Sequence, residues 1–134
     1  MKVIVDTSVW SLSLRRQKQQ NNSIANRLGD LINDGRVILL GAVRQEILSG
    51  IKHQKQFEKL RNRLKVFPNL ELDVEDYELA AEYFNICRRH GVQGANTDFL
   101  ICAVANRRNY EIFTTDKDFI NFSQYLSIVL TRLQ

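Results

Sequence analysis

The chain has 134 residues, of which 44% are hydrophobic and 25% charged, as in an ordinary globular protein with one hydrophobic core. No apolar run approaches the ~20 residues that a membrane span needs, and a strand pattern follows Met1 at once. We therefore expect a cytoplasmic protein with no signal peptide and no membrane contact. The 19 Lys and Arg exceed the 15 Asp and Glu, and a net charge of +4 is weak evidence for a polyanionic partner.

The first stretch of the chain joins a β-branched run, Val3-Ile4-Val5, to a carboxylate and two hydroxyl residues, Asp6, Thr7 and Ser8. A strand buried on both faces has no room for an unpaired charge. Asp6 is therefore expected just past the carboxyl end of this strand, where open α/β sheets place their ligand sites. A helix N-cap is the alternative interpretation of Asp6.

Periodic apolar patterns predict alternating strands and helices along the rest of the chain. In the first half of the chain, the predicted helices are a short one through Val9 and Leu14, one from Ile24 to a stop at Asp34-Gly35, one after Gly41 through Ile51, and an amphipathic one from Gln54 to Phe67. A fifth helix is expected to start with residues 73–76, to carry Tyr77 and Phe84 on its core side and to end near His90-Gly91. Asp98 opens a sixth. Besides the first strand, the predicted strands are Val37–Leu40, Leu70–Leu72, Glu111–Thr114 and Ser127–Leu130. This alternation predicts a single domain over residues 1–134, an α/β fold arranged as a three-layer α/β/α sandwich with a five-stranded, mainly parallel sheet.

Two basic segments each allow more than one interpretation. Residues 15–22 form either a solvated loop or a flap that contacts phosphates. In the segment Gln54 to Phe67, Lys and Arg occupy much of the surface beside an apolar face. That segment is a solvated helix face, a phosphate-contacting surface or part of a groove for a partner helix.

The two cysteines, Cys87 and Cys102, each fall inside a helical apolar pattern, so we expect two buried, reduced thiols. With only two histidines, His53 and His90, a Cys/His zinc site is disfavoured. The sequence also has no G-x-S-x-G, P-loop or G-x-G-x-x-G pattern, which argues against the corresponding hydrolase and nucleotide-binding chemistries.

Four acidic residues fall at comparable places in the predicted fold: Asp6 after the first strand, Glu46 in the helix after the second, Asp98 at a helix start and Asp116 after the strand that begins at Glu111. Each taken alone could be a helix cap or an exposed side chain. Carboxylates brought together repel one another, and the repulsion is relieved either by a cation or by the uptake of protons. Oxygen ligands without His or Cys favour Mg²⁺ or Mn²⁺, and such a site on a basic protein suits phosphodiester cleavage.

The chain resembles the PIN-domain ribonucleases, and most closely the small VapC-type toxins of toxin–antitoxin pairs. The resemblance rests on four motifs in the family's order: residues 3–10 with Asp6, Glu46 in its helix, residues 97–105 with Asp98, and residues 113–119 with Asp116. It covers essentially the whole chain, and the four motifs together are specific. The segment 94–97, in the loop that shapes the substrate mouth in this family, departs from the Ile- or Pro-containing segment of many relatives.

The resemblance implies a Mg²⁺- or Mn²⁺-dependent endoribonuclease that acts on RNA, tRNA being one candidate. Asp6 and Asp98 match the most direct metal ligands, and Glu46 and Asp116 match the rest of the acidic cluster. Thr7 and Thr114 would be hydroxyls that orient these carboxylates, and Asp118 would be an alternative to Asp116 or its support. The family further implies a homodimer and a small antitoxin whose segment covers the acidic pocket. The competing hypotheses are a non-catalytic RNA- or protein-binding module and a structure-specific DNA nuclease with the same fold.

Overall fold

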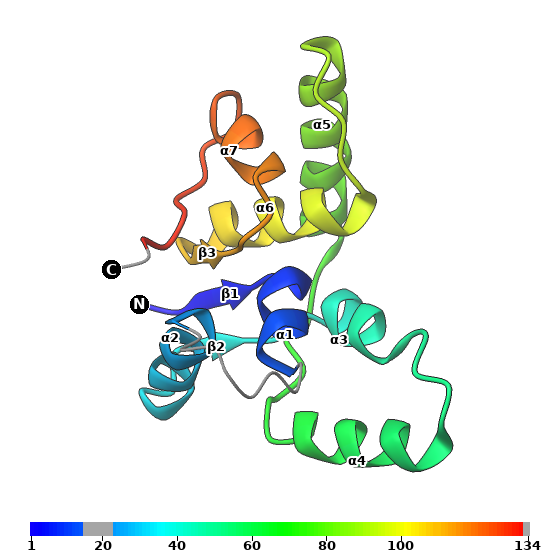
Figure 1. Ribbon diagram of the computed structural model, residues 1–134. Coiled ribbons are helices and arrows are strands. Elements are labelled where there is room, and N and C mark those ends of the chain that lie inside the picture. Colours follow the sequence, from blue (N-terminus) through cyan, green and yellow to red (C-terminus); the bar gives the residue numbers. More distant parts are fainter. Residues whose placement is uncertain (15–22, 133–134) are drawn as a thin grey trace.

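A computed structural model describes residues 1–14 and 23–132, and a parallel β-sheet lies at its centre (Figure 1). The strands are β1 (Val3–Val5), β2 (Val37–Ile38) and β3 (Glu111–Phe113). Their order is β2-β1-β3, and the register pairs Ile4 with Ile38 on one side and Ile112 on the other. All three residues of β1 are fully buried, which explains its unbroken β-branched run. The basic loop predicted at residues 15–22 lies outside the described residues.

The helices of the described chain are α1 (Thr7–Leu14), α2 (Ser23–Asn33), α3 (Gly41–Leu48), α4 (Gln54–Leu64), α5 (Val74–Arg89), α6 (Asn96–Arg108) and α7 (Asp118–Ser123). α1 packs on α2 and α3, and α3 packs on α4. α5 packs along α6, which in turn contacts both β1 and β3. In Figure 1, α1 to α4 therefore form one group beside β2, and α5 to α7 lie on the β3 side. None of these helices is long and apolar enough to cross a membrane.

The α/β class is confirmed, but the prediction of five strands is wrong for the described residues, which contain a three-stranded sheet. Residues 70–72 join α4 to α5 outside the sheet, and the Glu71 carbonyl accepts a hydrogen bond from the Arg108 side chain (3.3 Å). Residues 127–130 meet β3 only through one isolated parallel bridge. An apolar run becomes a strand only where its backbone N–H and C=O groups find a neighbouring edge over several residues.

Burial along α5 differs from the prediction. Tyr77, expected on the core side, is 56% exposed, whereas Asp76 is completely buried and Tyr83 nearly so. The apolar spacing did not predict this orientation, because the side of α5 that faces α6 carries the buried Asp76 carboxylate rather than Tyr77. Helix α6 also begins at Asn96, two residues before the predicted start at Asp98.

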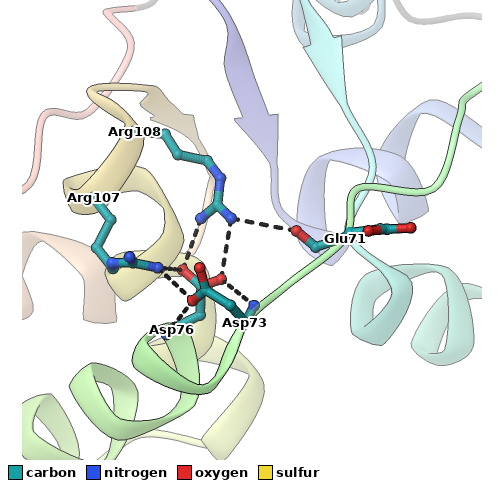
Figure 2. Close-up of polar contacts among 5 residues, drawn as sticks. All are labelled: Glu71, Asp73, Asp76, Arg107 and Arg108. Atoms are coloured by element: carbon teal, nitrogen blue, oxygen red, sulfur yellow. Dashed lines mark hydrogen bonds and ion pairs between the residues drawn. The ribbon is translucent and has the colours of Figure 1, made fainter.

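Asp76 belongs to an ion cluster that joins the start of α5 to the end of α6 (Figure 2). Arg108 contacts both carboxylate oxygens, with Nη1–Oδ1 at 2.7 Å and Nη2–Oδ2 at 3.0 Å. Arg107 bridges Asp76 (2.8 Å) and Asp73 (2.7 Å), while the two aspartates form a capping box at the start of the helix. The Arg108 guanidinium holds the pKa of the Asp76 carboxyl well below its usual range, against the opposing effect of burial. The cluster therefore fixes the position of α6, the helix whose other end carries Asp98.

Helix α6 is the most buried helix of the described chain, and its apolar residues pack between α5 and the sheet. Cys102 of α6 and Cys87 of α5 are both fully buried and free, as predicted. Burial raises the pKa of both thiols. Before α6, a side chain at Gly94 would bring a Cβ within 2.5 Å of the Phe122 ring, so this close approach requires glycine.

Helix α4 is attached to the rest of the molecule through its C-terminal end. Arg44 of α3 donates to the carbonyl oxygens of Leu64 (Nη1, 2.9 Å) and Phe67 (Nη2, 2.8 Å). Carbonyls at the end of a helix lack partners within the helix, and here a guanidinium supplies them. The Trp10 ring of α1 packs edge-on against Phe67, at 5.3 Å between ring centroids.

Candidate functional site

Asp6 lies directly after β1 and is only 5% exposed. Its backbone N–H continues the sheet by donating to the Phe113 carbonyl (2.9 Å). Its side-chain Oδ2 accepts two hydrogen bonds, from Ser8 Oγ (2.8 Å) and from Thr114 Oγ1 (2.8 Å). Two hydroxyls therefore hold one oxygen of this buried carboxylate, and no described residue donates a hydrogen bond to Oδ1.

The same hydroxyls tie Asp6 to the loop after β3. Ser8 Oγ accepts from the backbone N–H of Thr115 (3.1 Å), and Thr114 Oγ1 accepts from that of Asp116 (3.0 Å). Because each hydroxyl donates its single hydrogen to Asp6 and accepts from the loop, the polarity of the network is consistent. The ends of two neighbouring parallel strands are therefore held at one edge of the sheet.

Asp116 and Asp118 have different places in this loop. Oδ1 of Asp116 accepts from the backbone N–H of Asp118 (2.9 Å), and the Asp116 side chain is half-buried. Asp118 is the first residue of α7, where the helix dipole stabilises a negative charge, and its side chain is exposed. The structure therefore brings Asp116 to the strand edge, whereas Asp118 supports it through the backbone.

Glu46 comes from the middle of α3 and is exposed. Its Oε1 accepts a hydrogen bond of 2.6 Å from Thr7 Oγ1, at the start of α1. Thr7 and Ser8 are adjacent, but their hydroxyls thus bind different carboxylates. The contact of Ser8 with Asp6 was missed at the sequence level, although its place two residues after Asp6 is the available signal.

Asp98 lies in the first turn of α6, and its Oδ2 accepts a hydrogen bond from the Ala95 backbone N–H (3.0 Å). Burial, followed by the negative charges of Asp6, Asp116 and Glu46, raises the pKa of Asp98 to about 6, although the Ala95 hydrogen bond acts in the opposite direction. The charge effects show that the carboxylates of four separate segments are close enough to interact. As described, however, no group of three or more Asp, Glu, His and Cys side chains is arranged to hold one metal ion.

This donor set suits a hard cation, because it consists of carboxylate oxygens without His or Cys. Helix capping explains the Ala95 contact of Asp98 but not the gathering of the other three carboxylates around it. The half-buried to exposed side chains of Asp116 and Glu46 are the ones with room to move. The residues therefore suit a divalent cation by donor type, although the described side chains do not enclose a metal position.

A groove of about 480 Å³ lies beside this site, between α1, α3 and α4. Its lining includes the apolar side chains of Leu14, Ile47 and Leu60, and the basic side chains of Lys59 and Arg63. Since α1 also carries Thr7 and α3 also carries Glu46, the groove and the acidic site share two helices.

A family model of the PIN domain matches residues 3–124, a range that includes all four carboxylates. The chain belongs to the PIN domain family. The resemblance to PIN domains is therefore confirmed. No curated protein was found to match the chain.

Solved structures show the same fold. This PIN domain is similar to FitAcB from Neisseria gonorrhoeae, with a TM-score of 0.75, 23% identity and 96% of both chains covered. It is also similar to VapBC2 from Rickettsia felis bound to a DNA fragment from their promoter (TM-score 0.78, 18% identity, 98% of both chains). A third similar structure is VapBC-5 from Mycobacterium tuberculosis, a member of the VapBC family of toxin–antitoxin systems. Its TM-score is 0.69 and its identity 20%, and the match covers 98% of this chain and 99% of that one. At these identities the similarity shows the shared fold.

Proposed function

We propose that this PIN domain is a divalent-metal-dependent endoribonuclease that hydrolyses RNA phosphodiester bonds. The single observation that carries the proposal is the effect of three other carboxylates on Asp98: burial is the main cause of its raised pKa, and the charges of Asp6, Asp116 and Glu46 raise it further. Such repulsion opposes folding, and a cation offsets it. Membership of the PIN domain family supports nuclease activity as the function of this acidic cluster.

The cation would be Mg²⁺ or Mn²⁺, held by Asp6, Glu46, Asp98 and Asp116. When bound, it would polarise the scissile phosphate and lower the pKa of an attacking water. The chain itself orients the oxygens: Ser8 and Thr114 hold Oδ2 of Asp6, and Thr7 holds Oε1 of Glu46. These contacts select which oxygen of each carboxylate remains for the cation.

The proposed biological role is the toxin of a type II toxin–antitoxin pair, acting in the cytoplasm. The support is the fold shared with VapBC structures, one of them named as a member of a family of toxin–antitoxin systems. We expect a small antitoxin whose segment covers the acidic site, and a homodimer of this chain. RNA is the substrate class, with tRNA as one candidate.

The mechanism is tested by Asp6→Asn and Asp98→Asn, with Asp30→Asn as the matched control on the exposed surface of α2. Each site variant should lower Mn²⁺-dependent cleavage of RNA at least a hundredfold, because each removes a charged oxygen that the cation requires. The control should cleave like the wild type, and EDTA should stop both. Cleavage that persists in both site variants or in excess EDTA contradicts the metal-carboxylate mechanism.

The competing functions give different results in the same assay. Single-stranded RNA, tRNA and flap DNA are offered side by side with Mg²⁺ and with Mn²⁺. Tight RNA binding without any product would identify a non-catalytic module, and cleavage confined to flap DNA would identify a DNA nuclease. Co-purification of a small protein that suppresses cleavage would support the toxin role.

A further inference from the structure

The positive charge of the chain is concentrated around α4. Residues 52–65 contain six Lys and Arg and one Glu, which is a larger excess than the net +4 of the whole chain. Residues 71–82, by contrast, contain six Asp and Glu and no Lys or Arg. Among the helices of residues 1–14 and 23–132, α4 is therefore the strongly basic one, and Figure 1 shows it at the far side of α3 from α5.

The basic side chains of α4 are exposed and form no ion pair with any described residue. They are Lys55, Lys59, Arg61 and Arg63, and Lys65 follows directly at the C-cap. Helical spacing places Lys59 and Arg63 on one flank of the apolar face, where they line the groove with α1 and α3. Arg61 lies on the other flank, with its guanidinium 5.8 Å from the Phe57 ring centroid. Positive charge thus surrounds the helix on every side except its packed one.

This charged surface is close to the acidic site. Ser11, which lines the groove, is one helical turn after Thr7, and Ile47, which also lines it, follows Glu46 directly. One turn is about 5.4 Å along a helix axis. A polyanion that presents one phosphodiester to the acidic cluster can therefore place neighbouring phosphates against α4.

We infer that α4 is the surface that holds the sugar-phosphate backbone of the nucleic acid cleaved at the acidic site. The inference rests on the proposed nuclease function and extends it to a substrate-binding element. Lys and Arg that neutralise phosphates release condensed counterions, which makes binding strong at low salt and independent of sequence. Within residues 71–82, Asp73 and Asp76 are paired with Arg107 and Arg108, but the four glutamates are exposed. These glutamates repel the same backbone and so favour its passage over α4.

An acidic helix of a protein partner is the other ligand that a basic groove could take. Such a helix seated in the groove would meet Lys59 and Arg63 but leave the positive charges on the opposite flank of α4 without a role. A phosphate backbone carries charge along its whole length and can be contacted from more than one side of the helix. The distribution of charge around α4 therefore favours the nucleic acid.

The test measures binding without cleavage, in EDTA and on the Asp6→Asn background. The probe is a fluorescein-labelled, single-stranded RNA 20-mer of mixed sequence, titrated from 50 to 300 mM KCl. The α4 variant combines Lys55→Gln, Lys59→Gln and Arg63→Gln. The matched control combines Arg88→Gln, Arg89→Gln and Arg132→Gln, which removes the same charge from exposed residues elsewhere.

The α4 variant should bind at least tenfold more weakly at 100 mM KCl. Three lost contacts should also make the slope of log K against log [KCl] shallower by about 2, since each neutralised phosphate contributes about 0.7 on a single strand. The control should bind within twofold of its parent, and all proteins should share one melting temperature. Equal binding by the α4 variant and the control would overturn the inference, as would a variant that keeps RNA binding and loses only a co-purifying inhibitory protein.

Failure of the proposed function gives a different result. The wild-type protein is incubated in parallel with the same RNA and Mn²⁺, and absence of product there refutes the nuclease. The comparison made in EDTA decides the role of α4 by itself, because it requires neither cation nor cleavage.

Discussion

The hydroxyls of the adjacent residues Thr7 and Ser8 donate hydrogen bonds to different carboxylates. Helix α1 begins at Thr7, so the backbone turns from a strand into a helix at this point, and the two side chains diverge. Thr7 reaches across to Glu46 on α3, while Ser8 turns back to Asp6 and to the backbone of Thr115. The sequence motif places both residues at the site, but the phase of the first helical turn decides which carboxylate each one binds.

The raised pKa of Asp98 leads to a prediction about stability. A carboxyl whose pKa is raised in the folded protein binds protons more tightly there than in the unfolded chain, so stability falls as pH rises from 3.8 to about 6. Asp98→Asn removes that charge while its amide oxygen can still accept from Ala95. Without divalent cations, the variant should therefore be more stable than wild type by about 1 to 2 kcal/mol at pH 7.5, after allowance for solvent screening.

Urea unfolding in EDTA at pH 4.0 and pH 7.5 measures this effect. The gain should nearly vanish at pH 4.0, where Asp98 is protonated in the folded protein, and Asp30→Asn should change stability by less than about 0.5 kcal/mol at either pH. An Asp98→Asn protein no more stable than wild type at pH 7.5 would contradict the idea that burial and the neighbouring charges disfavour the Asp98 carboxylate in the folded protein.

At the scale of elements, the α5–α6 pair depends on charge as well as apolar packing. The fully buried Asp76 carboxylate is satisfied by Arg107, Arg108 and the Asp73 backbone. Removing one member of a buried ion pair leaves the others desolvated and unpaired, which costs more than the pair contributes. The orientation of α6, and with it the placement of Asp98, therefore relies on a cluster at the opposite end of the helix.

Asp76→Asn should lower the free energy of unfolding by about 3 kcal/mol at pH 7. Because the Arg108 guanidinium lowers the pKa of Asp76 in the folded protein, the stabilisation is present above the ordinary value of 3.8 and is lost as pH falls below it. Urea titrations at pH 7 and pH 3 should thus show a smaller difference between variant and wild type at pH 3.

Asp73→Asn is the matched control for that experiment. The Asp73 side chain is 55% exposed, and Asn is a good N-cap, so a loss below about 1 kcal/mol is expected. Equal losses from the two substitutions would mean that burial of Asp76 contributes nothing particular to the helix pair.

At the scale of the whole molecule, apolar periodicity was sufficient for α1 to α6 and for the three strands of the sheet, whereas the short helix α7 was not predicted. Residues 70–72 and 127–130 carry the same apolar alternation but do not extend the sheet, because strand formation depends on distant backbone partners that a local pattern does not contain. The same limit applies to the candidate site. Asp6, Asp98 and Asp116 could be predicted from strand and helix ends, and Glu46 from the helix after the second strand. The Ser8 contact and the burial of Asp76 instead depend on three-dimensional orientation.

The two buried thiols provide a measure of global opening. Cys87 and Cys102 are fully buried, so a thiol reagent should label them only when the fold opens. A cation that binds only the folded state lowers the open population by the factor 1 + [L]/Kd. Free Mn²⁺ at about ten times its Kd should therefore slow labelling about tenfold, and EDTA should restore the rate.

The Asp6→Asn protein is the control for labelling, because it lacks the proposed ligand while both thiols remain in place. Its labelling rate should be insensitive to Mn²⁺. An equal slowing by Mn²⁺ in this variant and in the wild type would show that the cation binds elsewhere than at the acidic cluster.

The attachment of α4 has a consequence for how this surface can change during evolution. Arg44 holds the helix by the carbonyl oxygens of Leu64 and Phe67, groups that every residue type supplies. These hydrogen bonds therefore do not depend on the exposed side chains of α4. Mutations can redistribute its charges, and so alter what the surface recognises, without loosening the helix that carries them or disturbing the neighbouring acidic cluster.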